Sequence, residues 1–322
     1  MCSDRALQLL GGLAFVVASL CGLSQGYAAS KIKHVIVIAM ENSNAFSAQN
    51  GRFVYNNFAD APYINSLVGD AAIAVNFIDP LPLSVPSEAH YVYMEAGTSK
   101  FADFTFAGGI TGDFDPSATR STASREHLTA QIEATNGRVT WRSYQEDITQ
   151  ACPIDSDGRY AAKHNPFVFF QDVAGNPPSP NNTNCAAHMR PYTALARDMA
   201  ANQLASYNFI TPNLCHDMHD ACDGKTRVAG GDAWLKAELP GILKFTNRSA
   251  TVVFLVWDEG NNSRRMPFLA LGPTVRKGHV SAAVYDHGSM IKTVERIFRL
   301  PPLATVEAKN DLDDLFLPGA LP

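Results

Sequence analysis

Two stretches, one near each end of the chain, run as continuous apolar segments and stop abruptly at oxygen-bearing side chains. They are KHVIVIAMENSN (residues 33–44) and ATVVFLVWDEG (residues 250–260). Short apolar runs without helical spacing are typical of strands buried in the middle of a parallel sheet. The carboxyl ends of such strands meet at one edge of the sheet, where ligands bind. We therefore expect one site built from the residues that follow the two strands: Glu41, Asn42, Asp258 and Glu259.

Strand-like and helix-like patterns alternate through the rest of the chain. Further strands are predicted at residues 71–77, 138–145, 206–214 and 267–272. Helices are predicted at residues 58–68, 90–97, 126–133, 192–203, 231–244 and 289–298. Asp232 and Ser289 have the side chains of N-caps for the last two helices. This alternation indicates a mostly parallel α/β sandwich.

A segment rich in Gly, Thr, Ser and Asp, residues 103–124, interrupts this alternation. Such a composition is typical of irregular backbone. We expect this segment to form a surface loop or a lid.

The composition is that of an ordinary globular protein. The chain has 322 residues, of which 46% are hydrophobic and 18% charged, with a formal net charge of −5. This length can supply a large core. The mild acidity provides no basic stripe, so nucleic acid is an improbable partner. We assign residues 29–322 to one domain and leave the oligomeric state open.

The first 28 residues have the pattern of a secretory signal peptide. Arg5 precedes an apolar run from Leu7 to Leu23, and residues 26–28 fit a cleavage site between small residues. An uncleaved membrane anchor is the alternative, because the run is close to spanning length. With cleavage, no membrane span is expected in the mature chain. We therefore expect a secreted or periplasmic protein.

Four cysteines remain outside this leader: Cys152, Cys185, Cys215 and Cys222. An even number in an exported chain favours two disulfides, with three possible connectivities. We prefer the local pairs Cys152–Cys185 and Cys215–Cys222. A zinc site formed by Cys215, His216, His219 and Cys222 is the alternative.

Polar residues cluster at or near the expected carboxyl ends of several strands. Besides the two carboxylate-bearing stretches, they are Ser87, His164, Asn165, Asp217, His219, Asp220, Asp286 and His287. Taken singly, each has an ordinary structural explanation: an Asp-Glu pair is usually a turn, and a serine after proline is usually a helix cap. Their shared position at strand ends favours a site. Paired carboxylate and amide oxygens suit a hard divalent cation such as Mg²⁺, Ca²⁺ or Mn²⁺.

The remaining histidines do not stand beside such polar residues in the sequence. His34, His127, His188 and His279 have no suitable polar neighbours along the chain. We interpret them as surface histidines or as core histidines with satisfied hydrogen bonds.

Eight blocks of sequence resemble the phosphoesterase family, which comprises acid phosphatases and phosphatidylcholine-type phospholipases C. They are HVIVIAMENSNAF (34–46), PSEAHY (86–91), WRSYQE (141–146), KHNPF (163–167), FITPNLCHDMHD (209–220), DAWL (232–235), VVFLVWDEG (252–260) and YDHGSMIKTVE (285–295). They follow the family's order and span nearly the whole mature chain. The resemblance implies an alkaline-phosphatase-like α/β/α sandwich of three layers.

The resemblance also implies roles for individual residues. Those implied to hold a divalent metal ion, whose identity (Ca, Mg, Mn or Zn) stays open, are Glu41, Asn42, Ser87, Asp258 and Glu259. Ser87 stands where the family has its nucleophile, and a protonated His164 or His287 is expected to protonate the leaving group. Implied substrate-binding residues are His90, Asn165, Asp217, His219 and Asp220. The substrate is expected to be a small phosphorylated molecule.

The sequence departs from the family around the nucleophile. The family commonly has a histidine before Pro-Ser and Pro-Asn after it, whereas this chain has Val85, Ala89 and His90. His90 is therefore a candidate replacement for a phosphate-binding asparagine. The main hypothesis is an exported, metal-dependent phosphomonoesterase that acts through a phosphoserine and works best at acid pH.

Three alternatives stand beside this hypothesis. A phospholipase C-type phosphodiesterase would use the same site, but the chain lacks an obvious extra carboxy-terminal β domain. A metal-free serine hydrolase is disfavoured because the Gly-x-Ser-x-Gly elbow is missing. A non-catalytic secreted homologue would bind phosphate or metal without turnover.

Overall fold

The computed structural model describes residues 32–49, 52–55, 59–106 and 113–322. The predicted leader at residues 1–28 lies outside the described residues. Within the described ranges, no helix is long and apolar enough to cross a membrane.

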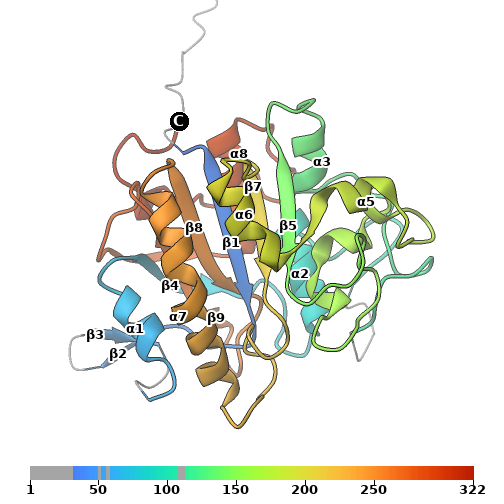
Figure 1. The fold of residues 1–322 in the computed structure, drawn as a ribbon. Coiled ribbons are helices and arrows are strands. Elements are labelled where there is room, and N and C mark those ends of the chain that lie inside the picture. Colours follow the sequence, from blue (N-terminus) through green and yellow to red (C-terminus); the bar gives the residue numbers. More distant parts are fainter. Residues whose placement is uncertain (1–31, 50–51, 56–58, 107–112) are drawn as a thin grey trace, which may run out of the picture.

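A nine-stranded mixed sheet runs through the middle of the molecule (Figure 1). Its order is β11-β4-β10-β8-β1-β7-β5-β6, with β9 paired to β4. The strands are β1 (His34–Met40), β4 (Ala72–Ile78), β5 (Trp141–Gln145), β6 (Met189–Pro191), β7 (Tyr207–Thr211), β8 (Thr251–Trp257), β9 (Arg265–Met266), β10 (Phe268–Leu271) and β11 (Val280–Tyr285). Only β9 and β10 run antiparallel to their neighbours in this described sheet. The predicted, mostly parallel sheet is confirmed. A separate hairpin pairs β2 (Ser47–Gln49) with β3 (Arg52–Val54).

Helices cover both faces of the sheet, with α6 and α7 in front of it and α2 and α8 behind it in Figure 1. The helices are α1 (Pro62–Leu67), α2 (Ser87–Ala96), α3 (Leu128–Glu133), α4 (Gln171–Ala174), α5 (Thr183–His188), α6 (Leu195–Ala200), α7 (Arg227–Thr246) and α8 (His287–Phe298). Short 3₁₀ turns are η1 (Ala162–His164), η2 (Pro166–Phe169), η3 (Tyr192–Ala194) and η4 (Asp313–Leu315). The fold is therefore the three-layer α/β/α sandwich.

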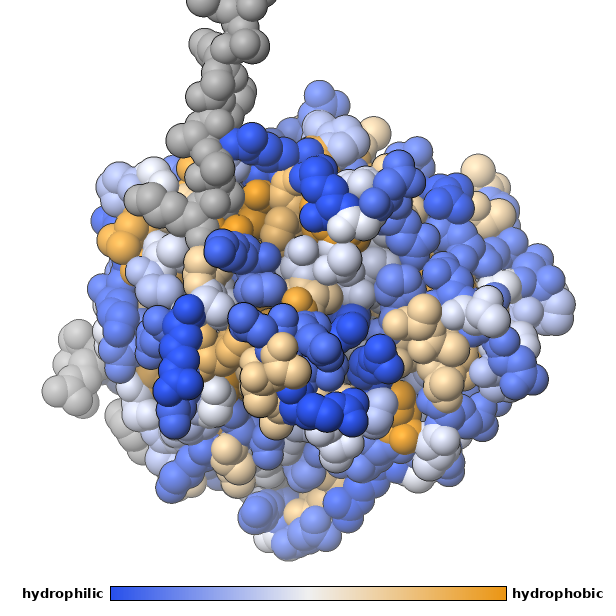
Figure 2. Space-filling model, turned by 45° about the horizontal axis from the view of Figure 1, so that its top comes forward, coloured by the Kyte–Doolittle hydropathy of each residue, from blue (hydrophilic) through white to orange (hydrophobic). Residues whose placement is uncertain are grey.

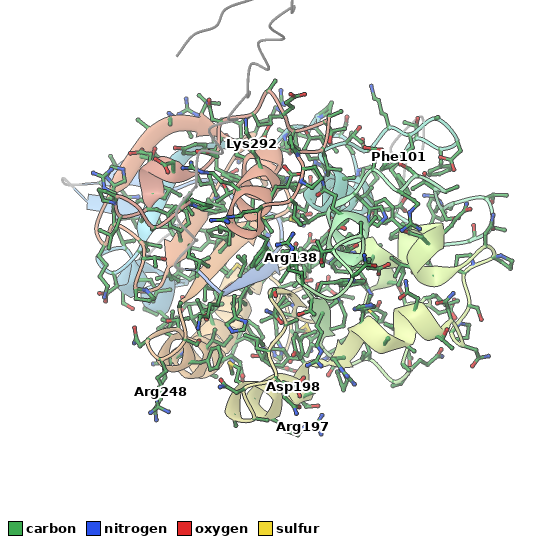
Figure 3. The ribbon with its side chains drawn as sticks, turned by 90° about the horizontal axis from the view of Figure 1, so that it is seen from above. Phe101, Arg138, Arg197, Asp198, Arg248 and Lys292 are labelled. Atoms are coloured by element: carbon green, nitrogen blue, oxygen red, sulfur yellow. A yellow bond between two sulfur atoms is a disulfide. The ribbon has the colours of Figure 1, made fainter. Side chains whose placement is uncertain are left out.

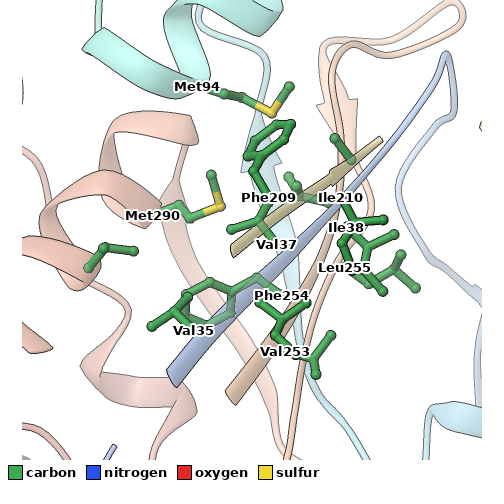
Figure 4. Packing of buried hydrophobic residues seen from close by; sticks show 14 of the residues in the cluster. Val35, Val37, Ile38, Met94, Phe209, Ile210, Val253, Phe254, Leu255 and Met290 are labelled. Atoms are coloured by element: carbon green, nitrogen blue, oxygen red, sulfur yellow. The ribbon is translucent and has the colours of Figure 1, made fainter. Parts of the chain in front are cut away.

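Strand β1 lies between β8 and β7, and both of its faces are covered. Val37 aligns with Phe254 on one side and with Phe209 on the other. Met94 of α2 and Met290 of α8 lie on this face of the sheet, while the alternate residues point to the opposite face (Figure 4). Burial on both faces explains the unbroken apolar run, and each buried side chain contributes about 1.5–3 kcal/mol.

Asp232 does not cap the helix predicted at residues 231–244. That helix is α7, which begins four residues earlier, and the Thr226 hydroxyl caps it by accepting from Ala229 N at 3.2 Å. The Asp232 carboxylate instead accepts from Tyr63 N at 3.1 Å and Ile64 N at 2.8 Å. Asp232 therefore caps α1, which has no cap of its own.

Ser289 is likewise not an N-cap. Asp286 caps α8 by accepting from Ser289 N, and the Ser289 hydroxyl oxygen accepts from Asp286 N, so the two form a capping box. The segment predicted as one helix at residues 192–203 divides into η3 and α6. Strand β11 was not predicted, because two adjacent alanines stand in its middle and three of its six positions are exposed, which leaves no clear alternation of apolar and polar residues.

Both preferred disulfides are present: Cys152–Cys185 and Cys215–Cys222. The zinc interpretation of Cys215 and Cys222 is therefore wrong, since an oxidised cysteine has no thiolate to offer a metal.

The outer surface is mainly polar in the view of Figure 2, where hydrophobic residues form small, separate groups. Arg138 and Arg248 precede β5 and β8 in the chain, so they lie at the end where the parallel strands begin (Figure 3). The acidic residues after β1 and β8 lie at the opposite end. These two arginines are therefore not charge partners for those acids.

Candidate active site

The carboxyl ends of β1 and β8 meet the amino terminus of α2 at one buried point. Glu41 follows β1, Asp258 and Glu259 follow β8, and Ser87 is the first residue of α2. All four side chains are buried. The Ser87 hydroxyl oxygen lies 3.2 Å from Glu41 Oε2 and 3.1 Å from Glu259 Oε1. The structure thus brings together residues from both ends of the chain, as the strand pattern predicts.

Main-chain contacts fix the two acidic loops against each other. Asn42 N donates to Asp258 Oδ1 at 3.0 Å, and Ser43 N donates to the Glu259 carbonyl at 3.1 Å. Asn42 has a φ of 48°, a left-handed conformation that asparagine tolerates better than most residues. The carboxylates therefore hold their positions through the backbone as well as through side-chain contacts.

The close packing of the backbone around Gly260 explains why a glycine follows Asp258 and Glu259. A Cβ atom at this position would lie 1.7 Å from the backbone oxygen of Ser263. Any side chain here would push the loop apart and displace Glu259.

The carboxylate cluster carries more negative charge than its surroundings balance. Burial, followed by the charges of neighbouring acids, raises the pKa of Glu41 well above its usual range. Burial and the charge of Asp258 raise the pKa of Glu259 to about 8. Burial also raises the pKa of Asp217 and of Asp258. Such shifts express the cost of placing several carboxylates together in a medium of low dielectric constant.

The residues present fit a divalent cation. Glu41 Oε1 and Asp258 Oδ2 are buried and have no hydrogen-bond partner among the described residues. One hydroxyl hydrogen of Ser87 can serve only one of the two carboxylates that it contacts. Oxygen atoms that face each other without enough protons are arranged as ligands for a cation.

Asn42 is oriented differently from the expectation. Its amide nitrogen donates to Glu41 Oε2 at 2.7 Å. An amide coordinates a metal through its oxygen, so Asn42 would have to turn over to join the ligands.

His164 lies between two acids on the other side of Glu41. Its Nε2 is 3.2 Å from Glu41 Oε1 and its Nδ1 is 3.1 Å from Asp217 Oδ2. The ring of Tyr91 stacks on it with centroids 4.9 Å apart. Burial, helped by the charges of Lys163 and His219, lowers the pKa of His164 well below its usual range. A protonated His164 is therefore disfavoured.

His219 is the more exposed member of this pair of histidines. Its ring centroid lies 5.4 Å from that of His164, and its side chain is 30% exposed. The His219 backbone N–H donates to Asp217 Oδ1 at 2.7 Å. Asp217 therefore positions both histidines.

His287 is buried and its ring is fixed by the protein. Its Nε2 lies 2.9 Å from the Trp257 carbonyl, to which it donates. Burial is the main reason that the pKa of His287 falls to about 4. The expected role of a protonated His287 as general acid does not fit this environment.

His90 faces the protein interior instead of an open substrate site. Its Nε2 lies 3.1 Å from Asp79 Oδ1, and its Nδ1 lies 3.2 Å from the Pro86 carbonyl. Burial alone would lower its pKa, but the neighbouring Asp79 carboxylate, with the charges of Asp258 and Glu259, raises it to about 9. Its contacts do not support direct substrate binding. Asp79 was not predicted, although it follows β4 directly and so occupies a strand end.

Two expected substrate-binding residues are not brought to the cluster by any contact of their side chains. The buried Asn165 amide donates to the Tyr160 hydroxyl at 3.1 Å. Asp220 is exposed and contacts the His219 ring at 2.8 Å.

The segment predicted as a loop or lid, residues 103–124, contacts helix α2 through residues of its described part. Asp113 Oδ1 accepts from Glu88 N at 2.9 Å, while the Glu88 carboxylate accepts from Phe114 N and Arg120 at 2.9–3.0 Å. Asp113 also pairs with Lys163 at 2.8 Å. These contacts hold the first turn of α2 and thereby position Ser87. They were not predicted from the sequence, because the residues that form them are far apart along the chain.

Three overlapping groups contain residue types that can hold a metal. They are Glu41–Asp258–Glu259, Glu41–His164–His219 and Asp79–His90–Glu259, and in each the ligand atoms lie within 4.8 Å of one another. The first contains the acids predicted from the strand ends. The other two share one carboxylate each with it.

A cavity of about 540 Å³ is lined by Asn42, whose amide contacts Glu41, but not by Glu41, Ser87, Asp258 or Glu259 themselves. Polar residues line most of it, including Ser43, Asn44, Arg227 and Asn261.

Comparisons with known proteins show the family and the fold. Residues 38–301 match the model of the "Phosphoesterase family". The chain is 27% identical over 306 residues to a phosphatidylinositol-3-phosphatase of Mycobacterium tuberculosis, covering 92% of this chain and 89% of that protein. It is 29% identical over 212 residues to a phosphate-repressible acid phosphatase of Penicillium chrysogenum, covering 61% of this chain and 48% of that protein. The fold resembles that of an alkaline phosphatase superfamily protein from Vibrio parahaemolyticus, with a TM-score of 0.52, 10% identity, and coverage of 88% and 71%.

Proposed function

This chain belongs to the phosphoesterase family and is a phosphoric ester hydrolase, and from that premise we propose that it is an exported, metal-dependent phosphomonoesterase acting through a phosphoserine at Ser87. The observation that carries the proposal is the contact of the Ser87 hydroxyl with Glu41 and Glu259 beside buried carboxylate oxygens that lack partners.

The cation would be held by Glu41, Asp258, Glu259 and the Ser87 oxygen, with Asn42 joining if its amide turns over. When bound, it would lower the pKa of the Ser87 hydroxyl and offset negative charge on the phosphoryl oxygens. The residues themselves supply rigidity, because the backbone bonds between the two acidic loops keep the carboxylates in place.

Ser87 is placed for attack on phosphorus. It opens a ten-residue helix, whose amino terminus favours negative charge on a bound phosphate. The Ser87 proton passes to a carboxylate oxygen that its hydroxyl already contacts. A bond forms between Ser87 Oγ and phosphorus while the bond to the alcohol breaks. Water then cleaves the phosphoserine, which releases phosphate and restores the hydroxyl.

His219 is the better proton donor for the leaving alcohol. It lies beside His164, is partly exposed and can exchange protons with solvent. His164 and Asp217 would orient it and line the phosphate pocket. Lys163 adds a positive charge held by Asp113.

Export rests on separate observations. The leader pattern at residues 1–28 is that of a signal peptide, and the two disulfides favour an oxidising compartment.

A phospholipase C-type diesterase is the second candidate. Leu83 and Phe114 have exposed side chains on the segments before and beside the nucleophile helix, where a lipid substrate would need an apolar rim. Arg120 covers one face of Phe114 at 4.0 Å. Two such residues fall well short of an apolar patch of several hundred Å². The monoester therefore remains the preferred substrate.

The test compares hydrolysis of a chromogenic phosphomonoester with that of its choline phosphodiester counterpart, from pH 4 to 9. Wild type and Ser87→Ala would each be assayed with chelator and after metal is restored. The proposal predicts metal-dependent monoester turnover that Ser87→Ala abolishes. Preference for the diester would favour the phospholipase. Turnover that survives both chelation and Ser87→Ala would refute the mechanism.

A further inference from the structure

We propose that Asp79, His90 and Glu259 hold a second divalent cation beside the one placed at Glu41, Asp258 and Glu259. The inference deepens the proposed function, since Glu259 belongs to both groups and Ser87 contacts it. Asp79 and His90 have no part in the phosphoryl transfer described above.

The first observation is a close approach of two polar atoms that do not form a hydrogen bond. His90 Nε2 lies 3.1 Å from Asp79 Oδ1, but the angles do not meet those of a hydrogen bond. His90 Nε2 and Asp79 Oδ2 are buried and have no hydrogen-bond partner among the described residues. A nitrogen and an oxygen about 3 Å apart that face a shared point have the spacing of two ligands on one ion with bonds of about 2.1 Å.

The second observation is that the rest of each side chain is held from behind. His90 Nδ1 faces the Pro86 carbonyl at 3.2 Å, which leaves Nε2 as the inward atom. Asp79 Oδ1 accepts from Leu81 N at 2.8 Å, and Arg264 donates to the Asp79 carbonyl at 2.6 and 3.0 Å. Metal-binding histidines and carboxylates are oriented by such outer hydrogen bonds.

The third observation is the local charge. Four buried carboxylates belong to the two groups that share Glu259: Glu41, Asp79, Asp258 and Glu259. One divalent cation offsets two of these charges, and Lys163 is already paired with Asp113. An imidazolium at His90 would offset at most one more. A second cation leaves a site that is close to neutral before the phosphate binds. One nitrogen and two carboxylates suit Mn²⁺ or Zn²⁺.

The shared Glu259 makes the two positions a bridged pair. Metals in bridged catalytic sites usually lie about 3.5–4 Å apart. His90 stands one helical turn after Ser87, so the second position lies on the α2 side of the first. The asparagine expected here from the family resemblance is a weaker metal ligand than histidine.

The experiment titrates chelator-stripped wild-type protein with Mn²⁺ and separately with Zn²⁺, following heat by calorimetry and, for Mn²⁺, the electron paramagnetic resonance spectrum. We expect two ions per chain, with the second Mn²⁺ equivalent producing an exchange-coupled spectrum. His90→Asn and Asp79→Asn should bind one ion, without coupling. His188→Asn, in which a half-buried histidine stacked on Trp141 is replaced, serves as the control and should still bind two.

The coupled spectrum needs only the wild-type protein, so a variant that fails to fold does not block the test. One ion per chain with both metals, or two ions without magnetic coupling, would overturn the second position and leave the proposed function standing. Binding of no ion at all would instead refute the metal dependence in the proposed function.

Discussion

Two groups of buried charged side chains lie at opposite ends of the same helix, α2. They differ in how the negative charge of their carboxylates is offset. Near its end, Glu95 shares the imidazole of His127 with Asp172, at 3.1 Å on each side. At its start, Ser87 meets the carboxylates of Glu41 and Glu259, and the nearby His90 is paired with Asp79 and not with either of these two acids.

The pKa shifts express the same contrast. Burial alone would lower the pKa of His127, but hydrogen bonds to Asp172 and Glu95 outweigh it and raise the pKa to about 9. At the other group, burial and mutual repulsion raise the carboxylate pKa values. At the Ser87 group the corresponding histidine, His164, also lies between two acids, but its pKa is lowered, so it does not offset their charge. His90 is paired with Asp79 and contacts neither carboxylate that Ser87 meets. We infer that the second group is reserved for a cation from solution, and that the first is structural.

The sharpest way to separate the two groups is to neutralise one acid in each. Asp258→Asn should lower kcat/KM for a phosphomonoester by more than about 100-fold, because loss of an outer partner alone costs 10- to 100-fold. Asp172→Asn, the matched change in the other group, should leave kcat/KM within about twofold. Both are measured by steady-state kinetics well below the unfolding temperature. Equal losses of activity would contradict the distinction.

For stability we expect the opposite order: a substitution in the group around His127 should cost more than one in the group around Ser87. Glu95→Gln should lower the free energy of unfolding by about 2–4 kcal/mol, since it leaves a buried imidazolium with one partner fewer. Urea denaturation at pH 6 would measure this change. If the variant is as stable as wild type, His127 is not charged in the folded protein.

The two groups should also respond to pH in different windows. His127 has a folded pKa of about 9 against 6.5 ordinarily, so its stabilisation is full below pH 6.5 and is lost as the pH rises through 9. Glu259 has a folded pKa of about 8 against 4.5, so metal-free stability falls between pH 4.5 and 8. Each effect is roughly 1–3 kcal/mol. The free energy of unfolding should be measured against pH for metal-free and metal-loaded protein. Metal should abolish only the loss of stability between pH 4.5 and 8, which comes from Glu259.

The smallest effect that we expect is a gain in the stability of the metal-free protein. In metal-free protein, Asp258→Asn should raise the free energy of unfolding by about 1 kcal/mol, because it removes one of several repelling charges. The control, Asp172→Asn, should lower it. Thermal unfolding in chelator would show the opposite signs, and a loss of stability in both variants would argue against repulsion at the Ser87 group.

The apolar patterns carried much of this information in advance. The runs before Glu41 and Asp258 predicted two buried parallel strands and the meeting of their terminal acids, because both follow from periodicity and sheet geometry. The cysteine pairs were also predicted correctly.

Contacts between distant segments could not be predicted in this way. Nothing near Asp232 in the chain indicates that it caps α1, or that Glu95 and Asp172 enclose His127. Asp79 occupies a strand end like the predicted acids, but it is a single acid before a proline, so no pair of ligands marked it in the sequence. Such partners depend on packing, which a linear pattern does not encode.

The central claim, that the acids around Ser87 form a metal centre, is tested most directly by a binding isotherm. Chelator-stripped wild type and Glu41→Gln/Asp258→Asn would be titrated with Mn²⁺ at pH 7, with Glu95→Gln as the control. The account predicts saturable binding by wild type and by Glu95→Gln, and its loss in the double variant. Absence of binding by wild type, or unchanged binding by the double variant, would contradict it.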